Sequence, residues 1–299
     1  MNVGFSNRTK GTLAIVASAF GFALMALFVR LCDEYGAPVS SIQKSFFRNV
    51  VALAIAAAAF CREPKSKAEG EPRKPMLHRF ASPWFFALFL RSVLGTIGIF
   101  ANFYALSHIT IAEGQTLNKT APFFTVVFAW LFLGERVNRR QLLTLVLAFL
   151  GVIFIAKPGF AGVQAFPLAM GLLGGVCAGG AYACVRALRK HEVNAAFIIL
   201  FFSAFSCLAS VPFMAVRFDP MTLAQVLILL GAGVGAAIGQ FGITAAYGYA
   251  APRDIAVFDY SNILFTAAFG FVFFAQVPDF WSVVGFVAIL FAALRLSRV

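Results

Sequence analysis

Four residues that could act on a ligand or bend a helix share one face of an apolar segment near position 119. Gln115, Asn118, Lys119 and Pro122 follow one another at i, i+3, i+4 and i+7, which places them on one side of an α-helix. A charge at the centre of a bilayer costs about 2.5–3.5 kcal/mol. We therefore expect Lys119 to face a wet cavity and bind a carboxylate or phosphate, and Pro122 to act as a hinge.

A second set of polar residues lies at matching positions later in the chain. A shift of 141 residues pairs Asn118 with Asp259 and Lys119 with Tyr260. Three explanations stay open. One is a structural ion pair between Lys119 and Asp259 that locks two halves together, and a second is direct contact of these residues with a substrate or a proton. Snorkelling of Lys119 toward the membrane surface is a third.

Further polar residues interrupt the apolar segments. Arg91 precedes Asn102 by 11 residues on one helical face; we expect Asn102 to contact a ligand and Arg91 to contact phosphate at the membrane surface. Lys44 and Arg48 are one turn apart, and they would either attract anions at an outer mouth or pair with Asp33 or Glu34. Two embedded residues are candidates for lining a cavity, although each alone is more often a satisfied core residue: Tyr182 and Gln240.

The composition is that of a membrane protein. Of the 299 residues, 61% are hydrophobic and only 12% are charged, and the mean hydropathy is +0.87. A soluble domain carries about twice that share of charge. Ten apolar segments are each about long enough to cross a bilayer as a helix, so the sequence predicts an all-α integral membrane protein with ten transmembrane helices. The segments are 11–32, 39–60, 83–107, 109–133, 140–157, 167–189, 194–216, 222–249, 253–275 and 280–297.

The net charge of +12 follows the membrane topology. With the N-terminus in the cytoplasm, 17 of the 24 lysines and arginines fall in inside segments and only four at outer ends. This bias predicts that both termini are cytoplasmic, and it explains the basic excess without nucleic acid.

The two halves of the chain resemble each other. A shift of 156 aligns Val29-Arg30-Leu31 with Val185-Arg186-Ala187, and a shift of 141 aligns Gly98 with Gly239. Since five is an odd number of helices, a duplicated second half must be inverted. We therefore expect two inverted five-helix repeats, 1–158 and 159–299, around a central cavity. The spacing of Gly175 and Gly179, and of Gly231, Gly235 and Gly239, predicts close helix packing.

Metal and disulfide chemistry have few candidates. The five cysteines are odd in number and form no CxxC pair, and there are only three histidines, so we expect no cofactor and no metal site. A membrane-embedded enzyme would need clustered acids, bases or ligands, which the helices lack, so we expect no enzymatic activity.

Several short motifs carry a family resemblance over essentially the whole chain: Phe46-Phe47-Arg48-Asn49, Arg91 with Gly95, Tyr104-Ala105-Leu106, Pro122, Gly134-Glu135-Arg136 and Gly151-Val152. The chain resembles the drug/metabolite transporter superfamily in its EamA branch, and within it the YddG-type exporters of aromatic and other amino acids. The second half departs from the pattern, because Ala275-Gln276 replaces Gly-Glu and Ile263 stands where the proline would be.

The resemblance implies a secondary transporter in the bacterial inner membrane that exports amino acids by alternating access. It implies a small-molecule substrate and the lipid bilayer as partners, and we expect a monomer. Nucleotide sugars, other organic anions and drugs are alternative substrates. Lys119 favours a ligand with a carboxylate or phosphate, whereas a cationic drug would need Asp259 unpaired.

Overall fold

The fold is built from helices throughout the described residues. The computed structural model describes residues 6–62, 83–108, 117–156, 165–275 and 280–297, and its regular elements in these ranges are all helical. They are α1 (Asn7–Glu34), α2 (Ser41–Arg62), α4 (Pro83–His108), α6 (Ala121–Leu133), α7 (Arg139–Ala156), α8 (Ala165–Lys190), α9 (Ala195–Val216), α10 (Leu223–Tyr249), α11 (Pro252–Ile255), the 3-10 helix η1 (Ala256–Tyr260), α12 (Ser261–Phe274) and α13 (Phe280–Ser297).

The length and surface of these helices suit a bilayer. Within the described ranges, seven helical stretches are long and apolar enough to cross a membrane, one of them formed by α11, η1 and α12 together. Large apolar side chains point outward; Phe132, Val216 and Phe280 are 77%, 89% and 73% exposed. Lipid is the solvent that such a surface requires, so the chain is a multi-pass membrane protein.

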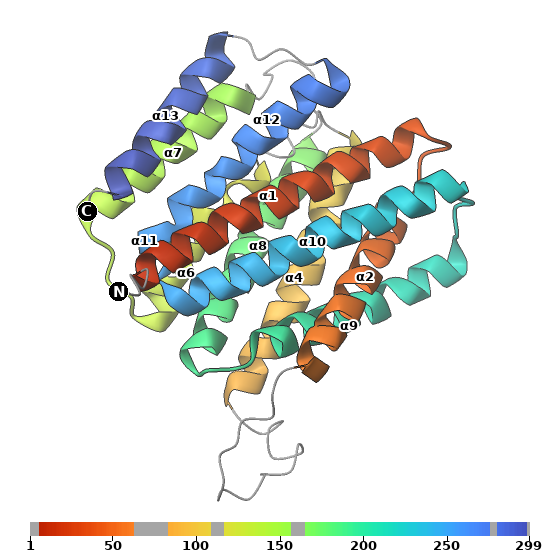
Figure 1. The fold of residues 1–299 in the computed structure, drawn as a ribbon, viewed down its shortest axis with the longest axis horizontal. Coiled ribbons are helices and arrows are strands. Elements are labelled where there is room, and N and C mark those ends of the chain that lie inside the picture. Colours follow the sequence, from red (N-terminus) through yellow and green to blue (C-terminus); the bar gives the residue numbers. More distant parts are fainter. Residues whose placement is uncertain (1–5, 63–82, 109–116, 157–164, 276–279, 298–299) are drawn as a thin grey trace, which may run out of the picture.

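Helices from distant parts of the chain pack in pairs. α1 runs beside α10, α4 beside α8, α2 beside α9 and α7 beside α13 (Figure 1). The first pair is close because a Cβ on Gly21 would lie 2.6 Å from the Gly239 nitrogen and 2.8 Å from the Gly235 oxygen. The predicted packing role of the glycine spacing in α10 is therefore confirmed.

Two of the predicted helices are interrupted. The segment 109–133 was expected to be one helix, but α6 begins at Ala121, and Lys119 and Thr120 before it form a turn. Pro122 lies in the first turn of α6, where its missing N–H is not needed, so it does not bend a helix interior as predicted. The segment 253–275 is divided into α11, η1 and α12. Gln115 lies outside the described residues.

α6 and α12 end in the same way. Gly134 follows α6 with φ 65°, and Ala275 follows α12 with φ 53°. Both residues adopt the left-handed conformation that ends many helices. Glycine does so without steric cost, whereas the alanine Cβ is strained there.

Candidate functional site

The two helix interruptions bring opposite charges together. The Lys119 Nζ lies 3.3 Å from the Asp259 Oδ2, and each side chain is only 7% exposed. Lys119 belongs to the turn before α6, and Asp259 belongs to η1. The ion pair that was one of the three explanations from sequence is therefore formed, and it joins the two halves of the chain. A buried pair of this kind is costly to separate, because each charge compensates the other.

A glycine-lined surface of α8 holds the Lys119 turn in place. A Cβ on Gly175 would lie 2.5 Å from the Leu117 oxygen, and one on Gly179 would lie 2.9 Å from the Ala121 oxygen. The predicted packing role of Gly175 and Gly179 is confirmed, since only small residues let the backbone of the turn approach α8 so closely. The Leu117 carbonyl accepts from the Thr120 backbone N–H at 3.2 Å and from the Thr120 hydroxyl at 2.7 Å, so two hydrogen bonds close the turn.

Arg91 is buried against two other helices. Its Nη2 donates to the Gln240 Oε1 of α10 at 2.7 Å, and its Cζ lies 3.6 Å from the centroid of the Phe202 ring of α9. The side chain is 1% exposed, so the expected contact with phosphate at the membrane surface is wrong for this structure. Its Nε and Nη1 have no hydrogen-bond partner among the described residues.

Arg48 and Lys44 differ in their surroundings. The Lys44 Nζ lies 2.6 Å from the Asp33 Oδ2, so of the two expected roles the structure shows the pairing with Asp33. Arg48, one turn further along α2, is 2% exposed, and its Nε has no partner among the residues described. Arg48 and Arg91 are near enough to interact electrostatically.

The remaining predicted residues fall into two groups. Tyr182 of α8 interacts electrostatically with Asp259, Arg91 and Arg48, so it links the ion pair to the arginines. Tyr260 is fully buried next to Asp259 in η1 and interacts with it electrostatically. Two residues are placed without such a link: Asn102 is buried where α4 meets α8 at Gly174, and Asn118 is partly exposed just before the turn.

These contacts define a central polar cluster drawn from α2, α4, α8, α10, η1 and the turn before α6: Arg48, Arg91, Lys119, Tyr182, Gln240 and Asp259. Its three cations and one carboxylate give a formal charge of +2. All four charged residues are at most 6% exposed as whole residues. The arrangement suits an anionic ligand, because buried charge is retained where it is compensated.

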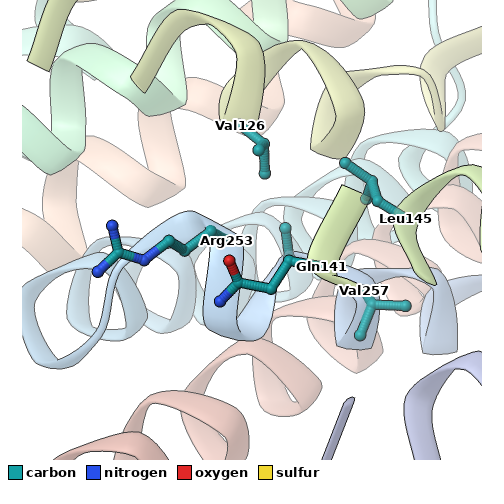
Figure 2. A pocket seen from close by; sticks show the side chains of 6 residues that line it. Val126, Gln141, Leu145, Arg253 and Val257 are labelled. Atoms are coloured by element: carbon teal, nitrogen blue, oxygen red, sulfur yellow. The ribbon is translucent and has the colours of Figure 1, made fainter. Parts of the chain in front are cut away.

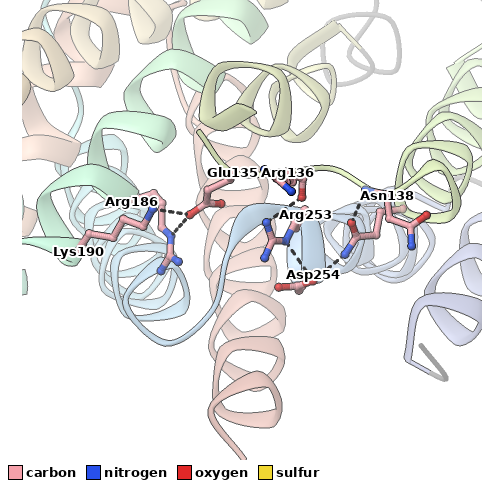
Figure 3. Close-up of polar contacts among 8 residues, drawn as sticks. Glu135, Arg136, Asn138, Arg186, Lys190, Arg253 and Asp254 are labelled. Atoms are coloured by element: carbon pink, nitrogen blue, oxygen red, sulfur yellow. Dashed lines mark hydrogen bonds and ion pairs between the residues drawn. The ribbon is translucent and has the colours of Figure 1, made fainter. Parts of the chain in front are cut away.

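A second polar network lies at the end of the bundle where α6 ends (Figure 3). Glu135 accepts a hydrogen bond from the Arg186 Nε at 2.9 Å and lies 3.2 Å from the Lys190 Nζ. The Arg186 Nη1 also donates to the Tyr247 carbonyl at 2.9 Å. Sequence analysis placed Glu135 only within a motif and missed this network, since its partners are distant in sequence. The network ties the loop after α6 to α8 and α10.

A small cavity lies beside this network. Figure 2 shows the side chains that line it: Val126, Gln141, Leu145, Arg253, Ala256 and Val257. Its volume is about 10 Å³, room for about one water molecule. It is therefore too small for a metabolite. Elsewhere in the described part of the chain, no three His, Cys, Asp or Glu residues gather as a metal site would require.

Charged side chains buried between membrane-spanning helices are typical of proteins that move polar solutes across a bilayer. The fold and the central polar cluster define a membrane transporter. The sequence pattern of the EamA-like transporter family matches residues 9–157. The Pseudopaline exporter CntI of Pseudomonas aeruginosa (strain UCBPP-PA14) is 31% identical over 292 residues, which are 97% of this chain and 96% of that protein. This chain belongs to the EamA-like transporter family.

Other relatives agree with the class and differ in the substrate they name. The Riboflavin transporter of Brucella anthropi is 29% identical over 218 residues, 70% of this chain and 75% of that protein. A solved crystal structure with 17% identity has a TM-score of 0.72 and covers 96% of both chains, which shows the same fold. The two relatives from Pseudomonas aeruginosa and Brucella anthropi are named as an exporter and a transporter, which favours transport over catalysis, and family membership alone leaves the substrate open.

Proposed function

We propose that this protein is a secondary transporter that exports amino acids or closely related carboxylates across the bacterial inner membrane by alternating access. The observation that carries the proposal is the central polar cluster. It lies among apolar helices, its formal charge is +2, and it is assembled from both halves of the chain. A substrate carboxylate would compensate this charge midway through the membrane.

Alternating access would follow from ten helices arranged as two inverted repeats, residues 1–158 and 159–299. The helix bounds support this arrangement. A shift of 141 carries α7 from 139–156 to 280–297, the bounds of α13, and carries the ends of α4 and α6 onto the ends of α10 and α12. A shift of 156 carries the end of α1 onto the end of α8.

The packing between helices also supports a repeat. If each helix is exchanged for its counterpart, the α1–α10 pair becomes the α8–α4 pair, and the α6–α8 pair becomes the α12–α1 pair; all four are in contact. The contact of Gly21 with Gly239 in one pair corresponds to the contact of Cys177 with Gly98 in the other. Chance similarity between apolar helices would not reproduce specific contacts in this way.

The interrupted helices fit the proposed mechanism. Interruptions at corresponding places in two repeats expose backbone and polar groups at mid-membrane, where transporters of this architecture bind substrate. Lys119 and Asp259 occupy these interruptions. The halves would rock about this region, opening first to one side and then to the other.

The proposed orientation places both termini in the cytoplasm. The beginning of α1 and the end of α13 lie at the same end of the bundle (Figure 1). The Lys and Arg bias predicts that this end is cytoplasmic. Export would then load substrate at the end that carries Glu135 and release it at the end that carries Lys44.

The substrate proposal rests on the cluster and on one relative. A relative that covers nearly the whole chain is named as an exporter, of pseudopaline. The cluster favours carboxylates because guanidinium and ammonium groups bind them with charge-assisted hydrogen bonds. Nucleotide sugars, other organic anions and drugs are the alternatives that the experiment must separate.

The test is counterflow with the purified full-length protein in proteoliposomes. Vesicles are loaded with one unlabelled compound and exposed to its labelled form. The panel comprises amino acids, pseudopaline, riboflavin, a nucleotide sugar and a quaternary amine. We expect counterflow of amino acids or pseudopaline well above that of empty vesicles. Counterflow of only the nucleotide sugar or the amine, or of no compound, would contradict the proposal.

A further inference from the structure

Resting on the proposed function, we infer that Arg48 and Arg91 together form a site for two carboxylates, which makes the preferred substrate an amino acid derivative with an additional carboxylate. A neutral aromatic amino acid would leave half of this site unpaired. The inference is built on the burial, the contacts and the charge of the two guanidinium groups.

Arg91 is held in place before any ligand arrives. Its guanidinium lies over the Phe202 ring, and the Gln240 amide oxygen accepts a hydrogen bond from its Nη2. One turn along α4, the absence of a side chain at Gly95 makes room, because a Cβ there would lie 2.9 Å from the Arg91 Nη1. Both groups that hold Arg91 are neutral, so they orient the guanidinium and leave its charge uncompensated.

Arg48 adds a second buried cation, on α2, which packs against the helix α4 that carries Arg91. Arg48 and Arg91 are 2% and 1% exposed. Three of their nitrogen atoms, the Arg48 Nε and the Arg91 Nε and Nη1, have no hydrogen-bond partner within the described ranges. Unpaired buried donors of this kind are costly unless a ligand accepts from them.

The acids near the cluster are already engaged. Asp259 is paired with Lys119 at 3.3 Å, and Asp33 is paired with Lys44 at 2.6 Å. Neither acid remains to neutralise the arginines, so the excess of +2 falls on Arg48 and Arg91. A ligand with two carboxylates would compensate both charges and accept from the free N–H groups.

The ligand must be a solute that enters between the helices. Side chains exposed by only 1–2% are out of reach of lipid headgroups. Guanidinium also binds phosphate, so inorganic phosphate belongs in the test as a competing ligand. Of the two ligand groups, carboxylate and phosphate, we choose carboxylate because the proposed substrate is an amino acid.

The test compares compounds that differ by one carboxylate. Binding to the purified full-length protein is measured for L-glutamate against L-glutamine, L-aspartate against L-asparagine, and N-carboxymethyl-phenylalanine against phenylalanine. In at least one pair, we expect the compound with the additional carboxylate to bind about tenfold or more tightly than its partner. This is the difference in affinity that one charged hydrogen bond supplies. This comparison needs no variant, so it decides the matter even where a variant fails to fold.

Two variants then assign the preference to the arginines. Arg48→Gln and Arg91→Gln should each weaken binding of the preferred diacid about 10- to 100-fold and reduce the preference over its partner compound. Arg217→Gln is the matched control: its side chain is 85% exposed, so removing its charge should leave both affinities unchanged.

The outcomes separate this inference from the proposed function. Equal binding within every pair, with counterflow of neutral amino acids intact, would overturn the diacid site and leave amino acid export standing. Tighter binding of inorganic phosphate than of any diacid would overturn the carboxylate assignment. Absence of counterflow for every compound would remove the proposed function and this inference with it.

Discussion

Removing Lys119 should damage both stability and transport, and a second substitution should separate the two effects. In Lys119→Ala, the Asp259 carboxylate stays buried without the partner that lies 3.3 Å from it in the wild type. Breaking a buried ion pair by removing one member costs about 3–5 kcal/mol. Little of this cost is screened by solvent, because both side chains are only 7% exposed.

The double variant Lys119→Met with Asp259→Leu removes both charges and keeps similar side-chain volume. Such replacements of buried pairs are often neutral or stabilising. We therefore expect the double variant to recover the thermal stability that Lys119→Ala loses. If the charges also contact substrate, the double variant should still transport at less than about a tenth of the wild-type rate, the loss expected for one charged contact.

The assay pairs thermal unfolding in detergent with counterflow in proteoliposomes for the wild type, the single variant and the double variant. Recovery of stability without recovery of flux is the expected result. Recovery of both would show that the ion pair only locks the two halves together. Full flux in Lys119→Ala would refute a role for Lys119 in substrate binding.

Three further predictions follow from the ends of the helices. Ala275→Gly should stabilise the protein by about 1 kcal/mol in thermal unfolding, because glycine adopts the left-handed φ of 53° without strain. Glu135→Gln should increase the rate of maleimide labelling at the half-buried Cys184 several-fold, because it removes the charge that ties the loop after α6 to α8 and so should loosen that end. Single cysteines at Arg136 and Arg217 should label from opposite sides of the membrane, the first from the cytoplasm.

Each of these predictions has its own control and refutation. Ala268→Gly, within α12, should destabilise by about 0.5–1 kcal/mol; an equal effect at both alanines would remove the argument from strain. Lys190→Gln should increase labelling less, since Lys190 is 41% exposed; equal increases would weaken the role of Glu135. Labelling uses a Cys61→Ser background, because Cys61 is exposed, and labelling from one side only would overturn the proposed topology.

The sequence predicts the helices well because hydropathy reports directly on bilayer length. The predicted span 280–297 coincides with α13, and 83–107 differs from α4 by one residue. The interruptions at Lys119 and in η1 were not predicted. The segments 109–133 and 253–275 were each predicted as one helix in spite of their polar residues, and Pro122 marks the start of α6 rather than a bend within a longer helix.

The candidate site was only partly predictable. The pairing of Lys119 with Asp259 was one of the explanations left open by the 141-residue shift, which placed polar residues at matching depths, and the structure shows it. The burial of Arg91 could not be predicted in the same way. The position of a residue along one helix gives its depth in the membrane, but not the side chains of other helices that contact it. Gln240 and Phe202 lie more than 100 residues from Arg91 in sequence, and it is their contacts that remove Arg91 from the membrane surface.

The most direct test of the central claim is an experimental structure of the protein in lipid nanodiscs with the best substrate from the counterflow panel. We predict ligand density between the two halves, within hydrogen-bonding distance of Arg91 and in contact with Arg48 or Lys119. Density bound outside the central polar cluster, with Arg48 and Arg91 unchanged and unliganded, would contradict the account.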